Sequence, residues 1–275
     1  MKRNLSIFIF IIMIMNTILS GCADQITANK SDSLVKKETE INTYTNEMKD
    51  GKVEIDGIWY DIRSVSKTTN TYDDNENAIE KVTIHDDDSE MRFEYLYENN
   101  QLIENRSYSN GEVSFTTYYY YEDDLMIKRK SVSKGGLEVV TEYSYGNKIK
   151  KQTHYASDGR ITFIAIAYLD DDNKILKAID TTADGEVMTS STFHYENDLL
   201  TKVISEKDGV IVKTFNYEYN NVGDKIMEYI IFYGKVNTLV AVFYDYEYDE
   251  NLLPKTVTVY RVQSPIADED IRDYQ

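Results

Sequence analysis

Apolar and polar side chains alternate along most of the chain beyond residue 50. In the segment that ends at Tyr219, one set of alternate positions is apolar or aromatic and the other set is polar. A period of two is typical of a β-strand, whose successive side chains point to opposite faces of a sheet. The segment that ends at Tyr248 follows the same pattern from Val240 onwards. Both segments therefore predict strands with one aromatic face and one more polar face.

This strand pattern repeats along the chain. Seven anchor segments carry an aromatic or apolar residue, then any residue, then a tyrosine, and their last tyrosines lie 23 to 29 residues apart. The anchor segments are residues 95–97, 119–121, 143–145, 166–168, 193–195, 217–219 and 246–248. A polar turn and then a Leu or Ile follow each of them, and most repeats have a second turn that contains glycine. Each repeat is therefore expected to form two strands joined by tight turns.

The turn sequences support a meander of hairpins. Pairs such as Asn110-Gly111 supply the positive φ angles that tight hairpins require, and Asp56-Gly57 predicts a further hairpin. A polar loop is expected over residues 67–77, and strands are expected on both sides of the acidic turn 86–89. Strongly twisted sheets of more than about ten strands curl or split. We therefore expect an all-β fold, a repetitive antiparallel β-hairpin meander that forms one large curved or partly closed sheet.

The last strand of this sheet contains a proline. Pro254 cannot donate a backbone hydrogen bond to a neighbouring strand, so it predicts that this strand is an edge of the sheet.

The N-terminus carries a different pattern. A positively charged start precedes a short apolar run over residues 5–15, which is typical of an export signal and too short for a confident membrane span. The run closes on Leu-Ser-Gly followed by Cys22, the one cysteine of the chain. This string resembles the lipobox of bacterial lipoproteins. The resemblance implies lipid attachment to the Cys22 thiol and a place on the outer, extracytoplasmic face of the cell membrane. The alternative is a plain secretory signal followed by a buried free cysteine.

The chain then divides into four parts. They are a signal peptide (1–21), the lipidated Cys22 with a polar tether (22–50), a repetitive β domain (51–260, with the repeats over 91–260) and an acidic tail (261–275). With lipid on Cys22 the chain has no thiol for a disulfide or a metal site, and its own core must hold it together.

The repeat as a whole resembles a known family. The order of Tyr-x-Tyr, polar turn, Leu or Ile, and then Asp-Gly or Asn-Gly is similar to the YD repeats of the RHS family and to repeat lipoproteins of gut and soil bacteria. The resemblance covers about residues 91–260, although the Asp that usually follows the second tyrosine is present only at Asp249. It implies a β-sheet scaffold that contacts or encloses something, and not an enzyme.

Charge and residue types exclude some classes of function. The formal net charge is −18, which repels nucleic acid phosphates, so no nucleic acid partner is expected. The three histidines, His85, His154 and His194, are not at metal-ligand spacing, and we interpret them as strand residues on the polar face. No catalytic residue, metal ligand or cofactor is predicted.

The acidic turns allow two interpretations. The turns over residues 73–77, 86–90 and 170–173 cluster oxygen ligands of the kind that Ca²⁺ prefers. In the first of them, Ala78 and Ile84 stand where a calcium loop has glycine and glutamate. Solvated turns are therefore favoured over a calcium site, which stays the alternative.

Tyrosine is unusually frequent, with 24 copies against 9 Phe. Most tyrosines are interpreted as cross-strand packing, whereas Tyr118 and Tyr120 lie on the opposite face from Tyr119 and Tyr121 and form a possible partner-contact surface. We hypothesise a membrane-anchored, non-catalytic binding or scaffold module for a protein or polysaccharide partner. The alternatives are a structural or envelope-assembly shell protein and a hydrolase that uses carboxylates.

Overall fold

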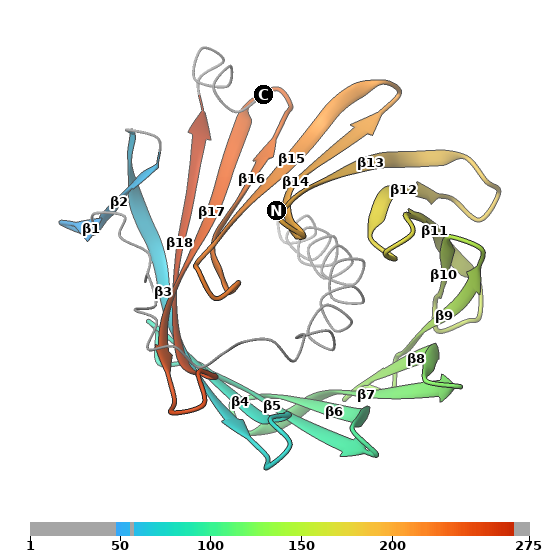
Figure 1. The fold of residues 1–275 in the computed structure, drawn as a ribbon, viewed down its shortest axis with the longest axis horizontal. Helices are drawn as coiled ribbons and strands as arrows, with labels where there is room; N and C mark the ends of the chain where they lie inside the picture. The colour runs from blue at the N-terminus through green and yellow to red at the C-terminus, as the bar shows by residue number, and fades with distance from the viewer. Residues whose placement is uncertain (1–47, 56–57, 267–275) are drawn as a thin grey trace. The chain divides into compact units, whose positions relative to one another are not determined.

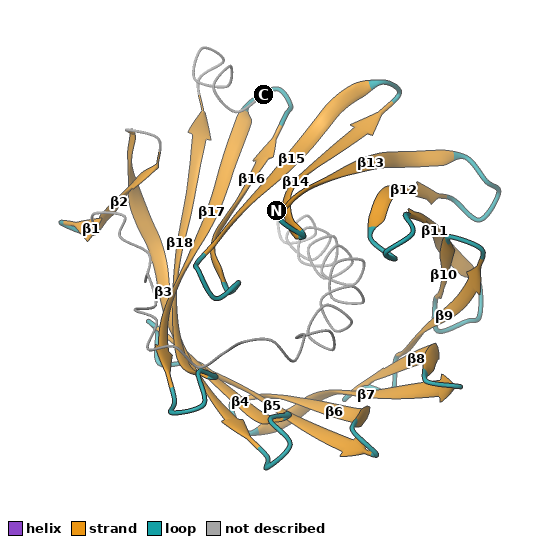
Figure 2. Cartoon of the chain, viewed as in Figure 1, coloured by secondary structure: helices purple, strands orange, loops and turns teal. Residues whose placement is uncertain are grey.

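The computed structural model describes residues 48–55 and 58–266 of the chain. Cys22, the signal peptide and the Asp56-Gly57 turn lie outside the described residues, so the predictions made for them stay predictions. All regular elements of this part are strands (Figure 2). None of its residues belongs to a helix long and apolar enough to cross a membrane.

Eighteen strands follow one another along the described residues. The first six are β1 (Met48–Lys49), β2 (Lys52–Ile55), β3 (Ile58–Tyr72), β4 (Ala78–His85), β5 (Glu90–Glu98) and β6 (Gln101–Ser109). The next six are β7 (Glu112–Glu122), β8 (Leu125–Ser133), β9 (Glu138–Gly146), β10 (Ile149–Tyr155), β11 (Ile161–Leu169) and β12 (Ile175–Thr181). The last six are β13 (Val187–Glu196), β14 (Leu199–Lys207), β15 (Val210–Tyr219), β16 (Lys225–Phe232), β17 (Asn237–Tyr248) and β18 (Pro254–Ile266).

Sixteen of these strands, β3 to β18, form a closed antiparallel barrel (Figure 1). Each strand pairs with the next one along the chain, and β18 pairs with β3, for example through Tyr260 opposite Val65. The all-β hairpin meander is confirmed, but the prediction of an open or partly closed sheet is wrong. The barrel closes because β3 has β4 on one side and β18 on the other.

The strand limits and pairings also correct two local predictions. The strand that contains Pro254 is not an edge, because β18 pairs with both β17 and β3. Pro254 is tolerated because it is the first residue of the strand, next to an irregularity in the pairing with β17. The polar loop expected over 67–77 is shorter, since β3 continues to Tyr72. The expected domain limit at residue 260 falls inside β18, and β1 falls inside the expected tether.

A small hairpin, β1 and β2, shows which face of the barrel wall points outward. β2 pairs with the start of β3, and its Val53 and Ile55 are buried in an apolar cluster with Leu239, Ala241 and Phe243 of β17. Figure 1 shows β1 and β2 outside the ring of strands. These three residues of β17 therefore lie on the outer wall, and the alternate residues, such as Tyr244 and Tyr246, lie on the inner wall.

The pairing register carries this assignment around the whole barrel. Residues directly opposite each other on adjacent strands share a face, so each pairing extends the inner and outer walls by one strand. The assignment is the same when it returns from β18 to β3, where Val257 and Thr68 are paired on the inner wall. Burial agrees with it on β11, where the inward Ala165 and Ala167 are buried and the outward Tyr168 is exposed.

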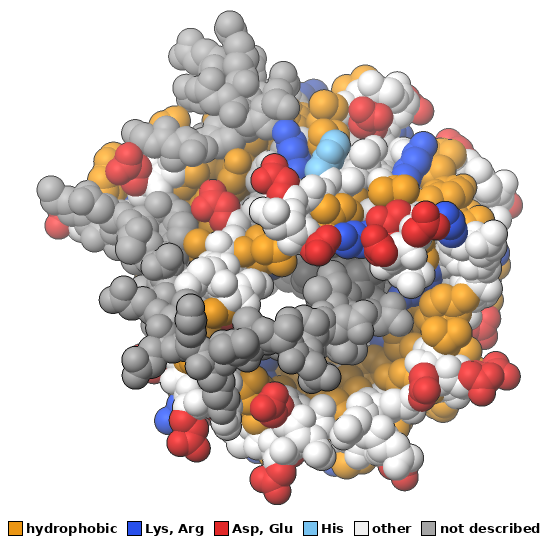
Figure 3. All heavy atoms as spheres, viewed as in Figure 1, with side chains coloured by type: hydrophobic (Ala, Val, Ile, Leu, Met, Phe, Trp, Pro, Cys, Tyr) orange, Lys and Arg blue, Asp and Glu red, His pale blue; other side chains and the backbone are white. Residues whose placement is uncertain are grey.

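The strand directions define two ends of the barrel. The odd-numbered strands from β3 onwards finish at one end, which we call the anchor end because the anchor segments lie there. The opposite end is where β3 begins and β18 finishes. The eight turns of the anchor end contain twelve carboxylates and two lysines. In the view of Figure 3, acidic side chains are spread around the periphery of the barrel.

Candidate functional site

The inner wall of the barrel is rich in aromatic side chains. Its inward-facing aromatic residues include Phe93, Tyr95, Tyr119, Tyr121, Tyr143, Tyr145, Phe163, Phe193, Tyr195, Phe215, Tyr217, Tyr244 and Tyr246. Many of them are only half-buried. A barrel of about eight strands is filled by its own side chains, whereas about sixteen strands enclose a wider lumen. The aromatic wall therefore surrounds a space that this barrel's side chains do not need to fill.

Tyrosines of several anchor segments hold the ends of the hairpins together. The hydroxyl of Tyr121 donates to the Leu102 carbonyl at 2.9 Å, and the hydroxyl of Tyr145 donates to the Met126 carbonyl at 2.8 Å. Tyr219 and Tyr246 make equivalent bonds to the carbonyls of Leu200 and Lys225. Each bond reaches the start of the preceding even-numbered strand. These tyrosines therefore stabilise the fold through their hydroxyls, and their rings line the lumen.

The fourth anchor segment, residues 166–168, faces the other way. Tyr145 and Tyr168 are 23 residues apart, and Ile166 and Tyr168 pair with outward-facing residues of β12. The inner wall of β11 instead carries Ala165 and Ala167. Ala178 of β12 lies directly opposite Ala167. The aromatic lining is therefore interrupted by small side chains at β11 and β12.

A cluster of polar side chains lies beside this interruption. Lys150, Gln152 and His154 occupy three successive inward positions of β10, opposite Ala167, Ala165 and Phe163 of β11. They are 6%, 5% and 5% exposed. On the other side of β10 they pair with Tyr145, Tyr143 and Thr141 of β9, and Arg129 of β8 lies opposite Thr141. We call Arg129, Lys150, Gln152 and His154 the inner polar cluster.

His154 is held in a defined orientation. Its Nδ1 lies 3.0 Å from the Thr141 hydroxyl, and its ring stacks on Phe163 with 3.8 Å between the ring centres. Burial and the nearby Arg129 charge lower the pKa of His154 to about 4, so the ring is neutral at neutral pH. The prediction that His154 lies on the polar face is wrong, because its strand position shares the face of the anchor tyrosines. Exposed His194 lies on the outer wall, and His85 ends β4.

Several buried polar atoms of the inner wall lack a hydrogen-bond partner among the described residues. They include Nε2 of His154, Oε1 of Gln152, Oδ1 of Asp180 and the hydroxyl of Tyr217. A buried polar atom without a partner costs about 1–3 kcal/mol, so natural proteins rarely leave one without a ligand or water. Two of the four atoms belong to the inner polar cluster.

The inner wall differs in charge from the rest of the molecule. Apart from the first and last residue of each strand, its paired positions carry five cations, Lys81, Arg129, Lys150, Lys213 and Arg261, and two carboxylates, Asp180 and Glu228. Burial lowers the pKa of Lys81 and Lys213 and raises the pKa of Asp180. Glu228 accepts hydrogen bonds from Lys225 and from Tyr244. A chain with a net charge of −18 thus has a lumen that is positively charged.

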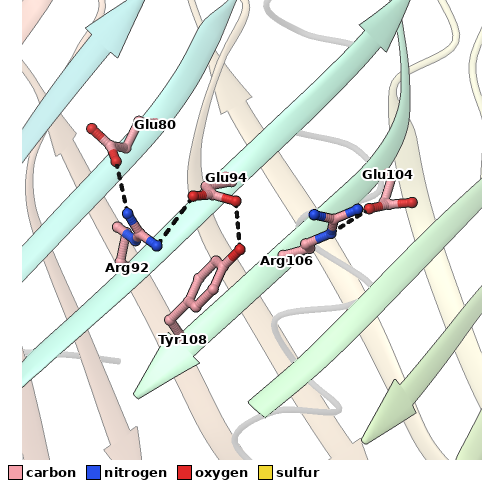
Figure 4. A network of polar contacts seen from close by, with 6 residues as sticks. All are labelled: Glu80, Arg92, Glu94, Glu104, Arg106 and Tyr108. Carbon is pink, nitrogen blue, oxygen red and sulfur yellow. Dashed lines mark hydrogen bonds and ion pairs between the residues drawn. The ribbon is translucent and has the colours of Figure 1, made fainter. Parts of the chain in front are cut away.

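The outer wall, in contrast, carries charges of both signs beside polar and apolar side chains. Figure 4 shows one network on β4, β5 and β6, with the remaining strands of the barrel behind it. Arg92 lies 3.6 Å from Glu80 and 3.2 Å from Glu94, and the Tyr108 hydroxyl donates to Glu94. Lys128, Lys130, Lys151, Lys177 and Lys202 also face outward at the middle of their strands.

The acidic turns use their oxygen atoms to hold the backbone. Oδ1 of Asp73 accepts hydrogen bonds from the amides of Asn75 and Asn77, and Asp170 does the same for residues 172 and 174. Among the described residues, no group of three or more His, Cys, Asp or Glu side chains is placed to hold a metal ion. These contacts explain the acidic turns as hairpin turns that are closed by their first residue.

Tyr118 and Tyr120 lie on the outer wall, where they are 36% and 43% exposed. The ammonium of Lys128 lies 5.9 Å from the centre of the Tyr120 ring. Their role as a partner-contact surface stays a prediction. They are far less enclosed than the inner polar cluster, which the sequence analysis did not single out.

Comparison with known proteins adds little beyond the fold. No protein-family model and no curated protein matches the chain. Among solved structures, the chain is similar to a porin-like protein from Bacteroides uniformis ATCC 8492, with 10% sequence identity and a TM-score of 0.31. The similarity covers 74% of this chain and 96% of that one. With so low a TM-score, closure of this barrel and the nature of its walls rest on the strand pairings and burial described above.

Proposed function

We propose that the protein is a non-catalytic binding barrel that encloses a ligand against its inner wall and is held on the extracytoplasmic face of a membrane by lipid on Cys22. The observation that carries the proposal is the combination of an aromatic inner wall with buried polar atoms that have no partner among the described residues. Ligand sites in proteins are mostly apolar, with a few placed polar groups that orient the ligand. The inner wall has this composition, and the outer wall does not.

The outer wall supports a barrel that stands in water and not in the bilayer. A barrel that spans a membrane presents an apolar band to the lipid, and a Lys or Arg at the middle of that band costs about 2–4 kcal/mol. Here Lys130, Lys151, Lys177 and Lys202 all point outward, together with the network around Arg92. Membrane association is therefore assigned to the lipid on Cys22, and the protein is proposed to bind a ligand and not to conduct one across a bilayer.

Two matched substitutions test where the ligand binds. The mature chain from residue 22, with Cys22→Ser to keep it in water, is titrated with the fluorescent probe N-phenyl-1-naphthylamine. Ala167→Trp fills the inner wall and is expected to lower probe binding at least tenfold. Ile166→Trp adds the same ring to the outer wall and is expected to leave probe binding unchanged. Circular dichroism checks that both variants remain folded.

The opposite results count against the proposal. No binding of the probe by the parent chain, or equal binding by the two tryptophan variants, would show that the lumen is not a ligand site. Flotation with liposomes is the second measurement. The Cys22→Ser chain is expected to remain unbound, and stable insertion into lipid would overturn the water-facing outer wall.

A further inference from the structure

We infer that the inner polar cluster is the head-group site for an anionic amphiphile, a molecule with a single phosphate or carboxylate, a neighbouring hydroxyl group and an acyl chain. The inference rests on the proposed function, because it names the ligand class and the place of its charged end in the same lumen. Four observations, on small neighbouring side chains, charge, hydrogen bonding and the surrounding rings, point to it.

The first observation is the small size of the side chains on one side of the cluster. On the β9 side, Lys150 and Gln152 are flanked by Tyr145 and Tyr143, but on the β11 side they face Ala167 and Ala165. Elsewhere in the repeat these inward positions carry aromatic rings, as at Phe193 and Tyr195 of β13. The reversed fourth anchor segment therefore leaves the polar side chains of β10 beside methyl groups and not beside aromatic rings.

The second observation is the charge of this part of the wall. Lys150 and Arg129 are cations on β10 and β8, and the inward paired positions of β8, β9, β10 and β11 include no carboxylate. The next inward carboxylate is Asp180 on β12, which accepts a hydrogen bond from Thr189 at 2.8 Å. Charges that are removed from water attract a counter-ion more strongly than exposed ones. An anionic group is the chemistry that this wall selects.

The third observation is the set of buried polar atoms that have no hydrogen-bond partner within residues 48–55 and 58–266. When the Thr141 hydroxyl donates to Nδ1 of His154, the neutral ring carries its hydrogen on Nε2 and donates it into the lumen. Oε1 of Gln152 is an acceptor and requires a donor. A phosphate or carboxylate accepts from His154, and a hydroxyl on the same head group donates to Gln152. Both atoms are thereby satisfied by one ligand.

The fourth observation places the acyl chain. The rings of Tyr143, Tyr145 and Phe163 border the cluster, and Tyr119 and Tyr121 continue the inner wall on β7. Burial of each CH₂ group against such a surface is worth about 0.8 kcal/mol. The chain of the ligand therefore lies along the aromatic wall, and its charged end lies against β10.

One pair of lipids tests the inference directly. Oleoyl-glycerol-3-phosphate and oleoylglycerol share the acyl chain and a hydroxyl and differ in the phosphate. Each is used to displace N-phenyl-1-naphthylamine from the Cys22→Ser mature chain. The phosphate lipid is expected to bind at least tenfold more tightly. Lys150→Met, which removes the charge and keeps a long apolar side chain, is expected to abolish this preference.

Matched controls separate the possible failures. Lys151→Met removes the neighbouring charge from the outer wall and is expected to preserve the preference. If Lys150→Met is not folded by circular dichroism, Arg129→Met is used in its place. Equal affinity of the parent chain for both lipids, or a preference that survives the substitution, overturns the head-group site and leaves the binding barrel intact. If neither lipid nor the probe binds, the binding barrel fails as well.

Discussion

At the scale of single residues, the turns of this barrel depend on side chains that tolerate positive φ. The two-residue turns use Asn99-Asn100, Asp123-Asp124 and Asn197-Asp198, with φ between 48° and 69°. Asn and Asp adopt this conformation more easily than other residues because their short polar side chains bond to the local backbone. Glu76, Lys148 and Leu252 are exceptions, and Leu252, in the turn between β17 and β18, is the apolar one, with a φ of 62°.

Leu252→Gly is expected to stabilise the protein. A left-handed conformation costs a residue with a β-carbon about 1–2 kcal/mol, and glycine avoids that cost. The free energy of unfolding in urea should therefore rise by about 1 kcal/mol. Asn251→Gly in the same turn is the control, because Asn251 does not have a positive φ, and it should give no gain. A loss of stability in Leu252→Gly would contradict the strain at this position.

His154 makes the stability of the barrel depend on pH. Its pKa is lowered from 6.5 to about 4 in the fold, because the ring is buried and Arg129 is close. The charged residues that share the inner wall with it on β8 and β10 are Arg129 and Lys150. Between these two pKa values the unfolded chain binds the proton and the folded chain does not. Stability is therefore fully present above pH 6.5 and falls as the pH drops toward 4, by about 3 kcal/mol at most.

Urea unfolding at pH 7, 6 and 5 measures this effect. His154→Gln, which cannot be protonated, should lose less stability over this range than the parent chain. The loss of unfolding free energy in the variant must be subtracted from the loss in the parent chain, because carboxylates also titrate near the lower pH. Identical losses in both chains would show that His154 is not the group responsible.

At the scale of strands, the anchor tyrosines link neighbouring hairpins. The hydroxyl of Tyr219 donates to the Leu200 carbonyl at 2.9 Å, and burial raises the pKa of Tyr219 to about 12. Tyr219→Phe is expected to cost about 1 kcal/mol of unfolding free energy, because it removes this bond and keeps the ring. Tyr118→Phe on the outer wall is the control and should change stability by less than about 0.5 kcal/mol. Equal effects of the two substitutions would contradict the structural role of the anchor hydroxyl.

The strands and turns of this fold are readable from the sequence, but their faces are only partly so. The two-residue spacing within each anchor segment places its side chains correctly on one face. The odd interval of 23 residues between Tyr145 and Tyr168 accompanies the reversed fourth segment, whereas the odd interval of 29 residues between Tyr219 and Tyr248 leaves both tyrosines on the inner wall. Irregular pairings, such as the one at Tyr168 and Leu169, prevent a simple count from settling each face.

The inner polar cluster has a signal in the sequence that is easily misread. Lys150, Gln152 and His154 alternate with other residues like the solvent face of a strand. The tight turn at residues 147 and 148 pairs Lys150 with Tyr145, which puts the polar side chains on the anchor face. Composition alone assigns such residues to water, and only the hairpin register assigns them to the lumen.

At the scale of the whole molecule, closure of the barrel could not be predicted from local patterns. β3 and β18 are separated by most of the chain, and no turn joins them. Their pairing depends on the total number of strands and on the curvature that all of them accumulate. The sequence therefore predicts a curved sheet but not whether its two edges meet.

Closure is tested by a cross-link on the outer wall. Lys67 and Thr258 are directly opposite on β3 and β18. In the Cys22→Ser chain, Lys67→Cys with Thr258→Cys is expected to form a disulfide on mild oxidation, seen as a faster-migrating band without reductant. Lys67→Cys with Lys177→Cys joins two strands that are not neighbours and should give no such band. An open sheet would leave the first pair unlinked.

The chain enters and leaves the barrel at the end opposite the anchor end, since β3 begins there and β18 finishes there. A lipid attached upstream of Met48 would therefore be joined to the barrel at that rim. The rim with the greater negative charge would then point into the surrounding medium, away from phospholipid head groups of the same sign. An amphiphile that leaves the bilayer would then meet the less acidic rim first. The position of the lipid attachment would thus also determine which end of the barrel the ligand enters.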